Sequence, residues 1–190
     1  MISEHDRQFL TRLPVWNPAG DIVAQRRAWE ELAKVFNRIA IGGDSAGGNL
    51  AMSAITSSAP ELRAPVRAAL LFYGAYDLEA TAERTGAEAG LQVQLNTYVA
   101  GDKGLFADPR VSPLKAVAPG LLPPCFIMGA GNDSWCLADS LVLAQALSAV
   151  ASPYELHVME GMPHGFIQMS ALEGCRAAMR LMWKFLARNV

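Results

Sequence analysis

The chain has 190 residues, of which 52% are hydrophobic and 18% charged, and its formal net charge is −2 at pH 7. This composition excludes a disordered chain, and the length suffices for one domain with a substantial core. The small net charge gives no electrostatic reason to expect nucleic acid or an anionic membrane as a partner.

The first part of the chain predicts a helix and a short strand ahead of a glycine-rich turn. Residues 1–18 carry turn formers and no motif, and His5 beside Asp6 fits a solvated terminus better than a catalytic pair. Residues 21–36 are predicted to be helical because their apolar side chains recur at helical spacing. Residues 39–41, Ile-Ala-Ile, predict a strand.

The rest of the chain predicts alternating helices and strands. The predicted helices cover residues 49–57, 134–150 and 170–188, and the predicted strands cover residues 66–73, 123–129 and 154–159. Residues 74–113 form a polar, Gly-rich insert with a short helix at 91–99. This order predicts an α/β fold, a mostly parallel sheet with flanking helices, in a single domain over residues 1–190.

Two further features bear on the cellular setting. The longest apolar run, residues 68–76, is far shorter than the roughly 18 residues of a membrane-spanning helix, and no signal sequence opens the chain. Cys125, Cys136 and Cys175 are an odd number of cysteines without metal-type spacing, so we predict reduced thiols in a cytoplasmic protein.

The turn after the first strand carries the most specific motif. Residues 42–48 read Gly-Gly-Asp-Ser-Ala-Gly-Gly, which fits the G-x-S-x-G nucleophile elbow between a strand and a helix. The elbow forces Ser45 into a sparsely populated backbone conformation, and we expect side chains at Gly43 and Gly47 to collide with their surroundings. The alternative is an ordinary tight turn between a strand and a helix.

Four polar residues follow predicted strands: Ser45, Asp77, Asp133 and His164. Because the carboxyl ends of parallel strands share one rim, all four are expected there. A serine hydroxyl needs an imidazole to take its proton, and the imidazole needs a carboxylate to fix its tautomer. Ser45, Asp133 and His164 occur in the Ser, Asp, His order of α/β-hydrolases, so we predict that they form a triad.

Other residues compete with this assignment. Asp139 could replace Asp133, but helical spacing predicts that Asp139 is a surface or capping residue inside a helix. Asp77 is expected to cap a helix or a turn, and His157 to be structural or exposed.

Three residues next to the predicted triad are candidates for the substrate pocket: Asp44, Trp135 and Phe166. For Trp135 and Phe166, packing in the core is an equally weighted alternative.

Four stretches resemble the hormone-sensitive-lipase-like esterases, a branch of the α/β-hydrolases. They are GGDSAGGN at 42–49, DPRVSPL at 108–114, the stretch from LPPC to Asp133, and EGMPHGF at 160–166. The resemblance covers about residue 28 to the C-terminus. It implies hydrolysis of short- to medium-chain carboxylic esters through Ser45, Asp133 and His164, without a cofactor or a metal. It also implies that residues 74–113 contribute helices near the pocket.

The sequence departs from this family in two places. The family carries a His-Gly-Gly-Gly-type motif well upstream of the serine, which supplies most of the oxyanion hole, and a Tyr-Arg-Leu-Ala-Pro-Glu-like segment. Neither is present, and only 44 residues precede Ser45. We therefore expect a partial α/β-hydrolase fold without the N-terminal strands, in which the Ala46 N–H is the remaining oxyanion donor. Residues 129–139 are also a residue or two longer than in the family.

The missing neighbour of the strand at 39–41 predicts an exposed sheet edge, which invites pairing with another chain as a homodimer or as an aggregate. Two functional hypotheses follow. The first is a carboxylic ester hydrolase that works through an acyl-enzyme on a small-molecule ester. The alternative is a truncated, catalytically impaired hydrolase-like domain that binds a ligand or a partner. A peptidase or a thioesterase of the same fold is a third possibility.

Overall fold

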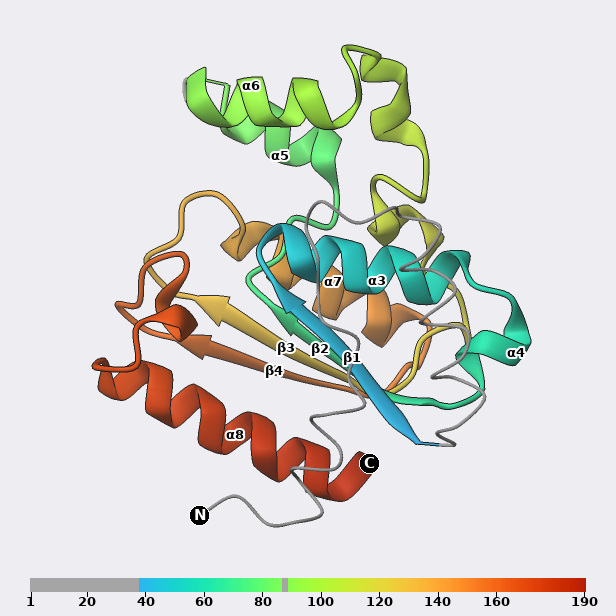
Figure 1. The fold of residues 1–190 in the computed structure, drawn as a ribbon, viewed down its shortest axis with the longest axis vertical. Coiled ribbons are helices and arrows are strands. Elements are labelled where there is room, and N and C mark those ends of the chain that lie inside the picture. Colours follow the sequence, from blue (N-terminus) through green and yellow to red (C-terminus); the bar gives the residue numbers. More distant parts are fainter. Residues whose placement is uncertain (1–37, 87–88) are drawn as a thin grey trace, which may run out of the picture. The chain divides into compact units, whose positions relative to one another are not determined.

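A sheet of four parallel strands organises the part of the chain that the computed structural model describes, residues 38–86 and 89–190 (Figure 1). The strands are β1 (Ile39–Asp44), β2 (Val66–Phe72), β3 (Cys125–Ala130) and β4 (Tyr154–Met159). They lie side by side in chain order, and every pairing is parallel. The predicted parallel sheet is confirmed.

Helices cover both faces of this sheet. α3 (Ala46–Ser57) and α7 (Leu137–Ala149) lie on one face, and α8 (Glu173–Asn189) lies on the other (Figure 1). A short helix, α4 (Pro60–Arg63), precedes β2. The three predicted helices in this region are confirmed. α3 begins three residues earlier than expected because the elbow opens directly into the helix.

The two central strands are buried on both faces, which explains their nearly continuous apolar sequences. Alternate residues of a strand point to opposite faces. One set packs with α8 in a cluster that includes Phe72, Phe126, Met128, Ala178 and Phe185. On the other face, a Cβ added at Gly129 would lie 3.0 Å from Leu137 of α7. The sheet thus forms the middle layer of the core.

The described part of the insert at 74–113, which leaves out residues 87–88, contains two helices and a 3₁₀ turn. They are α5 (Leu78–Arg84), α6 (Ala89–Tyr98) and η1 (Lys103–Ala107), and η2 (Pro113–Ala116) follows. α6 confirms the helix expected at 91–99, whereas α5 was not expected. Asp77 caps α5 as predicted, because its carboxylate accepts from the Glu79 and Ala80 N–H groups at 3.2 and 3.3 Å.

Two polar side chains of α3 bind the insert to the sheet domain. The Asn49 Nδ2 group donates to the Ala75 carbonyl at 2.7 Å and to the Val111 carbonyl at 3.0 Å. The Ser53 hydroxyl donates to the Arg110 carbonyl at 2.8 Å. α3 therefore holds the insert at both of its ends, next to the elbow from which α3 starts.

Asp139 of α7 is a buried carboxylate, so the prediction that it is a surface or capping residue is wrong. It accepts from the Tyr76 N–H at 2.7 Å and from the Thr81 hydroxyl at 2.9 Å, and it forms an ion pair with Arg84. Helical spacing placed Asp139 off the apolar face of its helix. The insert covers that side of α7, which spacing within one helix does not reveal.

Replacing Asp139 by alanine is expected to lower the free energy of unfolding by about 3–5 kcal/mol, because it leaves the Arg84 guanidinium and the Tyr76 N–H without their buried acceptor. Urea denaturation measures this change. Asp102→Ala is the control, since the Asp102 carboxylate is exposed and, among the residues that the structure describes, accepts only from the Gly104 N–H, at 2.9 Å, in the cap of η1. Equal losses in the two variants would contradict the anchoring role of Asp139.

Three sequence expectations bear on the molecule as a whole. No helix within residues 38–86 and 89–190 is long and apolar enough to cross a membrane. The three cysteines are free thiols and are buried, as expected for reduced cysteines. Among the described residues β1 pairs with β2 alone, and the homodimer stays a prediction.

The domain prediction extends beyond the described residues. Arg38–Val190 forms one unit. The helix expected at 21–36 and the assignment of His5 and Asp6 lie outside the described residues, and so does the first part of the predicted single domain.

Candidate active site

Ser45 occupies the sharp turn between β1 and α3. Its φ of 55° and ψ of −122° lie in a sparsely populated region, which costs of order 1–3 kcal/mol for a residue other than glycine. The Ser45 N–H donates to the Phe72 carbonyl at 2.9 Å, so the turn is tied to the end of β2. The nucleophile elbow expected from the sequence is therefore formed.

The two glycines that flank the elbow are not equivalent. A Cβ added at Gly43 would lie 2.4 Å from the Gly47 carbonyl oxygen, so a side chain there is excluded. A Cβ added at Gly47 would meet no atom within 4 Å in the part of the chain that the structure describes. The expected collision is confirmed at Gly43 and wrong at Gly47, because the Gly47 position faces open space.

His164 joins Ser45 to Asp133. Its Nε2 lies 2.8 Å from the Ser45 Oγ, and its Nδ1 lies 2.7 Å from the Asp133 Oδ2. A neutral imidazole has one N–H and one lone pair. Since the carboxylate can only accept at Nδ1, the Nε2 lone pair is left to accept from the serine hydroxyl. Residues 119 positions apart in the chain, Ser45 and His164, thus meet at the carboxyl end of the sheet.

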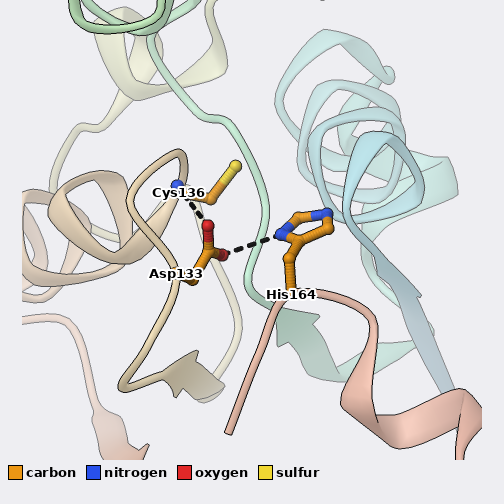
Figure 2. Close-up of side chains that lie close together, drawn as sticks. All are labelled: Asp133, Cys136 and His164. Atoms are coloured by element: carbon orange, nitrogen blue, oxygen red, sulfur yellow. Dashed lines mark hydrogen bonds and ion pairs between the residues drawn. The ribbon is translucent and has the colours of Figure 1, made fainter. Parts of the chain in front are cut away.

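Asp133 is fixed by the end of its own loop, just ahead of α7 (Figure 2). Its Oδ1 accepts from the Trp135 N–H at 2.9 Å and from the Cys136 N–H at 3.1 Å. Burial alone raises the pKa of Asp133, but the hydrogen bonds from His164 and from these two N–H groups outweigh burial and hold the pKa below its usual value. Asp133 is therefore ionised at neutral pH, and it contacts His164 while Asp139 does not.

Two aromatic rings enclose the His164 imidazole. The Tyr73 ring centroid lies 4.9 Å from the imidazole centroid, and the Trp135 centroid lies 5.4 Å from it. Tyr73 follows β2 with a φ of 35°, an uncommon value for a bulky residue. Sequence reasoning missed Tyr73, although an aromatic residue at the carboxyl end of a strand was a usable signal.

Two of the three candidate pocket residues lie elsewhere. Phe166 is fully buried in the core, 5.6 Å from the Tyr73 ring between centroids, so its assignment to the pocket is wrong. Gly165, with a φ of 79°, precedes it in the left-handed region. Asp44 does not line the cavity described below. Its carboxylate accepts from the Gln168 Nε2 at 2.6 Å, and burial together with Asp44 raises the pKa of Tyr73.

A cavity of about 360 Å³ opens beside Ser45 and His164. Trp135, the third pocket candidate, lines it. The cavity is also lined by Ala46, Asn49, Leu50, Ala75, Leu78, Thr81, Leu91, Gln94, Leu95, Tyr98 and Cys136. Its size falls in the range of small-molecule sites, roughly 300–1,000 Å³. The residues from α5 and α6 show that the insert builds much of its wall.

Asp133, Cys136 and His164 are the group of side chains here that could ligate a metal ion (Figure 2). Each offers one ligand atom, and these atoms lie within 4.8 Å of one another. Burial, with the Asp133 and Asp139 carboxylates nearby, raises the pKa of the Cys136 thiol to about 12. The thiol is therefore protonated at neutral pH, and the carboxylate and imidazole are hydrogen-bonded to each other.

The start of α3 supplies a donor next to the serine. Ala46 is the first residue of α3, so its N–H has no acceptor within the helix. It lines the same cavity as Ser45. A serine hydroxyl, an imidazole held by a carboxylate, and an N–H outside the helix's own hydrogen bonds, beside one cavity, are the parts that acyl transfer requires.

The sequence matches the model of one protein family, described as having the alpha/beta hydrolase fold, over residues 17–168. The chain is also 30% identical over 173 residues to the carboxylic ester hydrolase LipN of Mycobacterium tuberculosis. This match covers 84% of the chain and 46% of LipN, so the chain spans about half the length of this relative.

Solved structures of esterases share the fold of this chain. An esterase from the bacterial hormone-sensitive lipase family superimposes with a TM-score of 0.71 at 28% identity, over 93% of this chain and 61% of that one. Esterase E25 shares the fold with a TM-score of 0.74 at 22% identity, over 91% of this chain and 57% of that one. The chain therefore belongs to the α/β-hydrolase fold family and is similar to its hormone-sensitive-lipase-like esterases.

Proposed function

We propose that the chain hydrolyses carboxylic esters through an acyl-enzyme on Ser45. The observation that carries this proposal is the pair of hydrogen bonds that links Ser45 to His164 at 2.8 Å and His164 to Asp133 at 2.7 Å. The similarity to LipN and to bacterial esterases supports ester hydrolysis over the other reactions of this fold.

In the first half of the reaction, the His164 Nε2 takes the Ser45 proton as the Oγ attacks the ester carbonyl carbon. Negative charge develops on the carbonyl oxygen, and the Ala46 N–H stabilises it. His164 then protonates the departing alkoxide. Asp133 positions the imidazole and stabilises its protonated form throughout. Water attacks the acyl-enzyme by the same steps and releases the acid.

The cavity favours esters with short to medium acyl chains. The wall from α5 and α6 presents mainly hydrocarbon, through Leu78, Leu91 and Leu95. Burial of each CH₂ group against such a wall contributes about 0.8 kcal/mol, so kcat/KM is expected to rise as the acyl chain lengthens until the cavity is filled.

A substrate panel tests the proposed function. The purified chain is given p-nitrophenyl acetate, butyrate and octanoate, an acyl thioester and a peptide p-nitroanilide. We expect turnover of the esters, with kcat/KM for the thioester and the anilide well below that for the butyrate. Hydrolysis of the anilide or the thioester without ester hydrolysis contradicts the proposal. A folded chain that hydrolyses none of them supports the alternative of an impaired, ligand-binding domain.

Asp133→Asn is expected to lower kcat for p-nitrophenyl butyrate by about 10⁴, because an amide cannot hold the imidazole in the required tautomer. Steady-state kinetics measure the change. Asp77→Asn is the control, since Asp77 also follows a strand and asparagine caps helices as well as aspartate does. A kcat for Asp133→Asn within tenfold of the wild-type value contradicts the assignment of Asp133.

A further inference from the structure

Cys136 takes no part in the proposed reaction, yet it lines the cavity and its thiol lies close to two residues of the triad. One ligand atom from each of Asp133, Cys136 and His164 fits within a span of 4.8 Å (Figure 2). A thiol, an imidazole and a carboxylate are the ligand types that Zn²⁺ and similar cations select.

We propose that Cys136, His164 and Asp133 form a binding site for a thiophilic divalent cation, such as Zn²⁺ or Cd²⁺, and that the bound cation inhibits the enzyme. Cation binding depends on these three side chains alone. Inhibition also presupposes the proposed ester hydrolysis, so binding and inhibition are measured in separate experiments.

The three groups need small movements to surround a cation. Around tetrahedral Zn²⁺, sulfur lies at about 2.3 Å and nitrogen or oxygen at about 2.0–2.2 Å, so neighbouring ligand atoms lie roughly 3.3–3.7 Å apart. The imidazole and the carboxylate, now 2.7 Å apart, must separate slightly, and the thiol must approach them. Rotation about the Cα–Cβ bond of Cys136 moves the sulfur. The cavity that His164 and Cys136 line leaves room for water as the fourth ligand.

Charge and protons balance in this reaction. The Cys136 thiol loses its proton to solvent and binds as a thiolate, as metal sites require. The Asp133 carboxylate is already ionised. The imidazole stays neutral. When Nδ1 binds the cation, the proton that Nδ1 donates to Asp133 in the metal-free site moves to Nε2, and the Nδ1 lone pair is given to the cation. The bound cation carries one thiolate and one carboxylate, so the site is neutral.

Inhibition follows from the single lone pair of a neutral imidazole. His164 can take the Ser45 proton only with that lone pair, and a bound cation occupies it whichever nitrogen is the ligand. Metal binding and general-base catalysis at His164 therefore exclude each other. Activity is expected to return when a chelator removes the cation.

The binding test uses Cd²⁺ and the full chain, with thiolate-to-Cd²⁺ charge-transfer absorption in the ultraviolet as the readout. We expect saturation at one equivalent of Cd²⁺. Cys136→Ser keeps the size of the side chain and removes the soft ligand, so the affinity is expected to fall by at least about tenfold and the absorption to disappear. Cys175→Ser is the matched control, because Cys175 is also buried and its thiol donates to the Ile167 carbonyl, as a hydroxyl can.

His164→Ala gives a second test of the binding site that does not depend on how Cys136→Ser folds. Circular dichroism checks the fold of every variant. A charge-transfer signal that persists in Cys136→Ser, or is lost in Cys175→Ser, overturns the site. So does an unchanged Cd²⁺ affinity in His164→Ala.

The inhibition test compares p-nitrophenyl butyrate hydrolysis with and without Cd²⁺ in each variant, relative to that variant's own metal-free rate. We expect loss of more than nine-tenths of the wild-type rate at saturating Cd²⁺, recovery with EDTA, and little fractional inhibition of Cys136→Ser. Cd²⁺ bound at Cys136 with full activity retained overturns the inhibition and leaves the proposed function intact. Absence of ester hydrolysis in the metal-free wild type contradicts the proposed function instead.

Discussion

Ser45→Ala is expected to lower kcat for p-nitrophenyl butyrate by about 10⁶, to the level of the remaining binding and oxyanion effects. The Oγ of Ser45 is the atom that the His164 Nε2 approaches at 2.8 Å, and alanine removes it without adding bulk to the elbow. The strained backbone is retained, because alanine has the same Cβ as serine. Steady-state and single-turnover kinetics on the two proteins measure the loss.

The control for this variant is Ser57→Ala, at the exposed end of α3, which carries the same chemical change away from the cavity. It is expected to keep the wild-type kcat. Mass spectrometry confirms that the variant carries the substitution. A kcat above one per cent of the wild-type value in this protein contradicts the role of Ser45 as the nucleophile.

His164→Ala is expected to reduce kcat by about as much as Ser45→Ala, since members of a triad act as one unit and their losses do not add. The imidazole is the group that joins the other two, with hydrogen bonds at both ring nitrogens. Without it Ser45 keeps its proton. The double variant Ser45→Ala/His164→Ala is accordingly expected to match either single variant in kcat.

His157→Ala is the matched control, because His157 is the other histidine of the described residues. Its ring packs 5.2 Å from the Phe126 ring, and its Nε2 lies 3.3 Å from a Glu155 carboxylate oxygen. Its removal is expected to affect stability and to leave kcat within a few-fold of wild type. A kcat for His157→Ala as low as that of His164→Ala contradicts the assignment of the base.

Much of the site was predictable because it depends on local sequence signals. The elbow needs a strand, a sharp turn with a glycine where a side chain would collide, and a helix, and residues 39–57 carry all three. The order Ser, Asp, His and the position of each residue after a strand follow from parallel-sheet geometry. From these features the sequence predicted that Ser45, Asp133 and His164 lie together. In the structure they are linked by hydrogen bonds.

The errors come from contacts between segments that are far apart in the chain. Asp139 is buried because α5, which was not expected, covers its side of α7. Phe166 was a pocket candidate because it lies close to His164 in the sequence, and the structure instead realises the equally weighted alternative, packing in the core. The collision expected at Gly47 is absent because the space around this residue depends on how other segments pack, which the local sequence does not reveal.

The insert shows the same limit for function. Asn49 belongs to the elbow motif, yet its contacts with Ala75 and Val111 show that it also anchors the insert that walls the cavity. A pattern within the motif reveals the nucleophile. It does not reveal that Asn49 also anchors the insert, because the residues that Asn49 binds lie 26 and 62 positions away in the sequence.

Labelling with a serine-directed fluorophosphonate tests the central claim most directly, because the reaction needs an activated Ser45 and does not depend on the natural substrate. We predict one equivalent of covalent phosphonate on the wild-type chain by intact mass, located on Ser45 by peptide mapping. We also predict none on Ser45→Ala and far slower labelling of His164→Ala. A folded wild-type chain that stays unlabelled, or carries the label on another residue, would contradict the claim that Ser45 is the activated nucleophile.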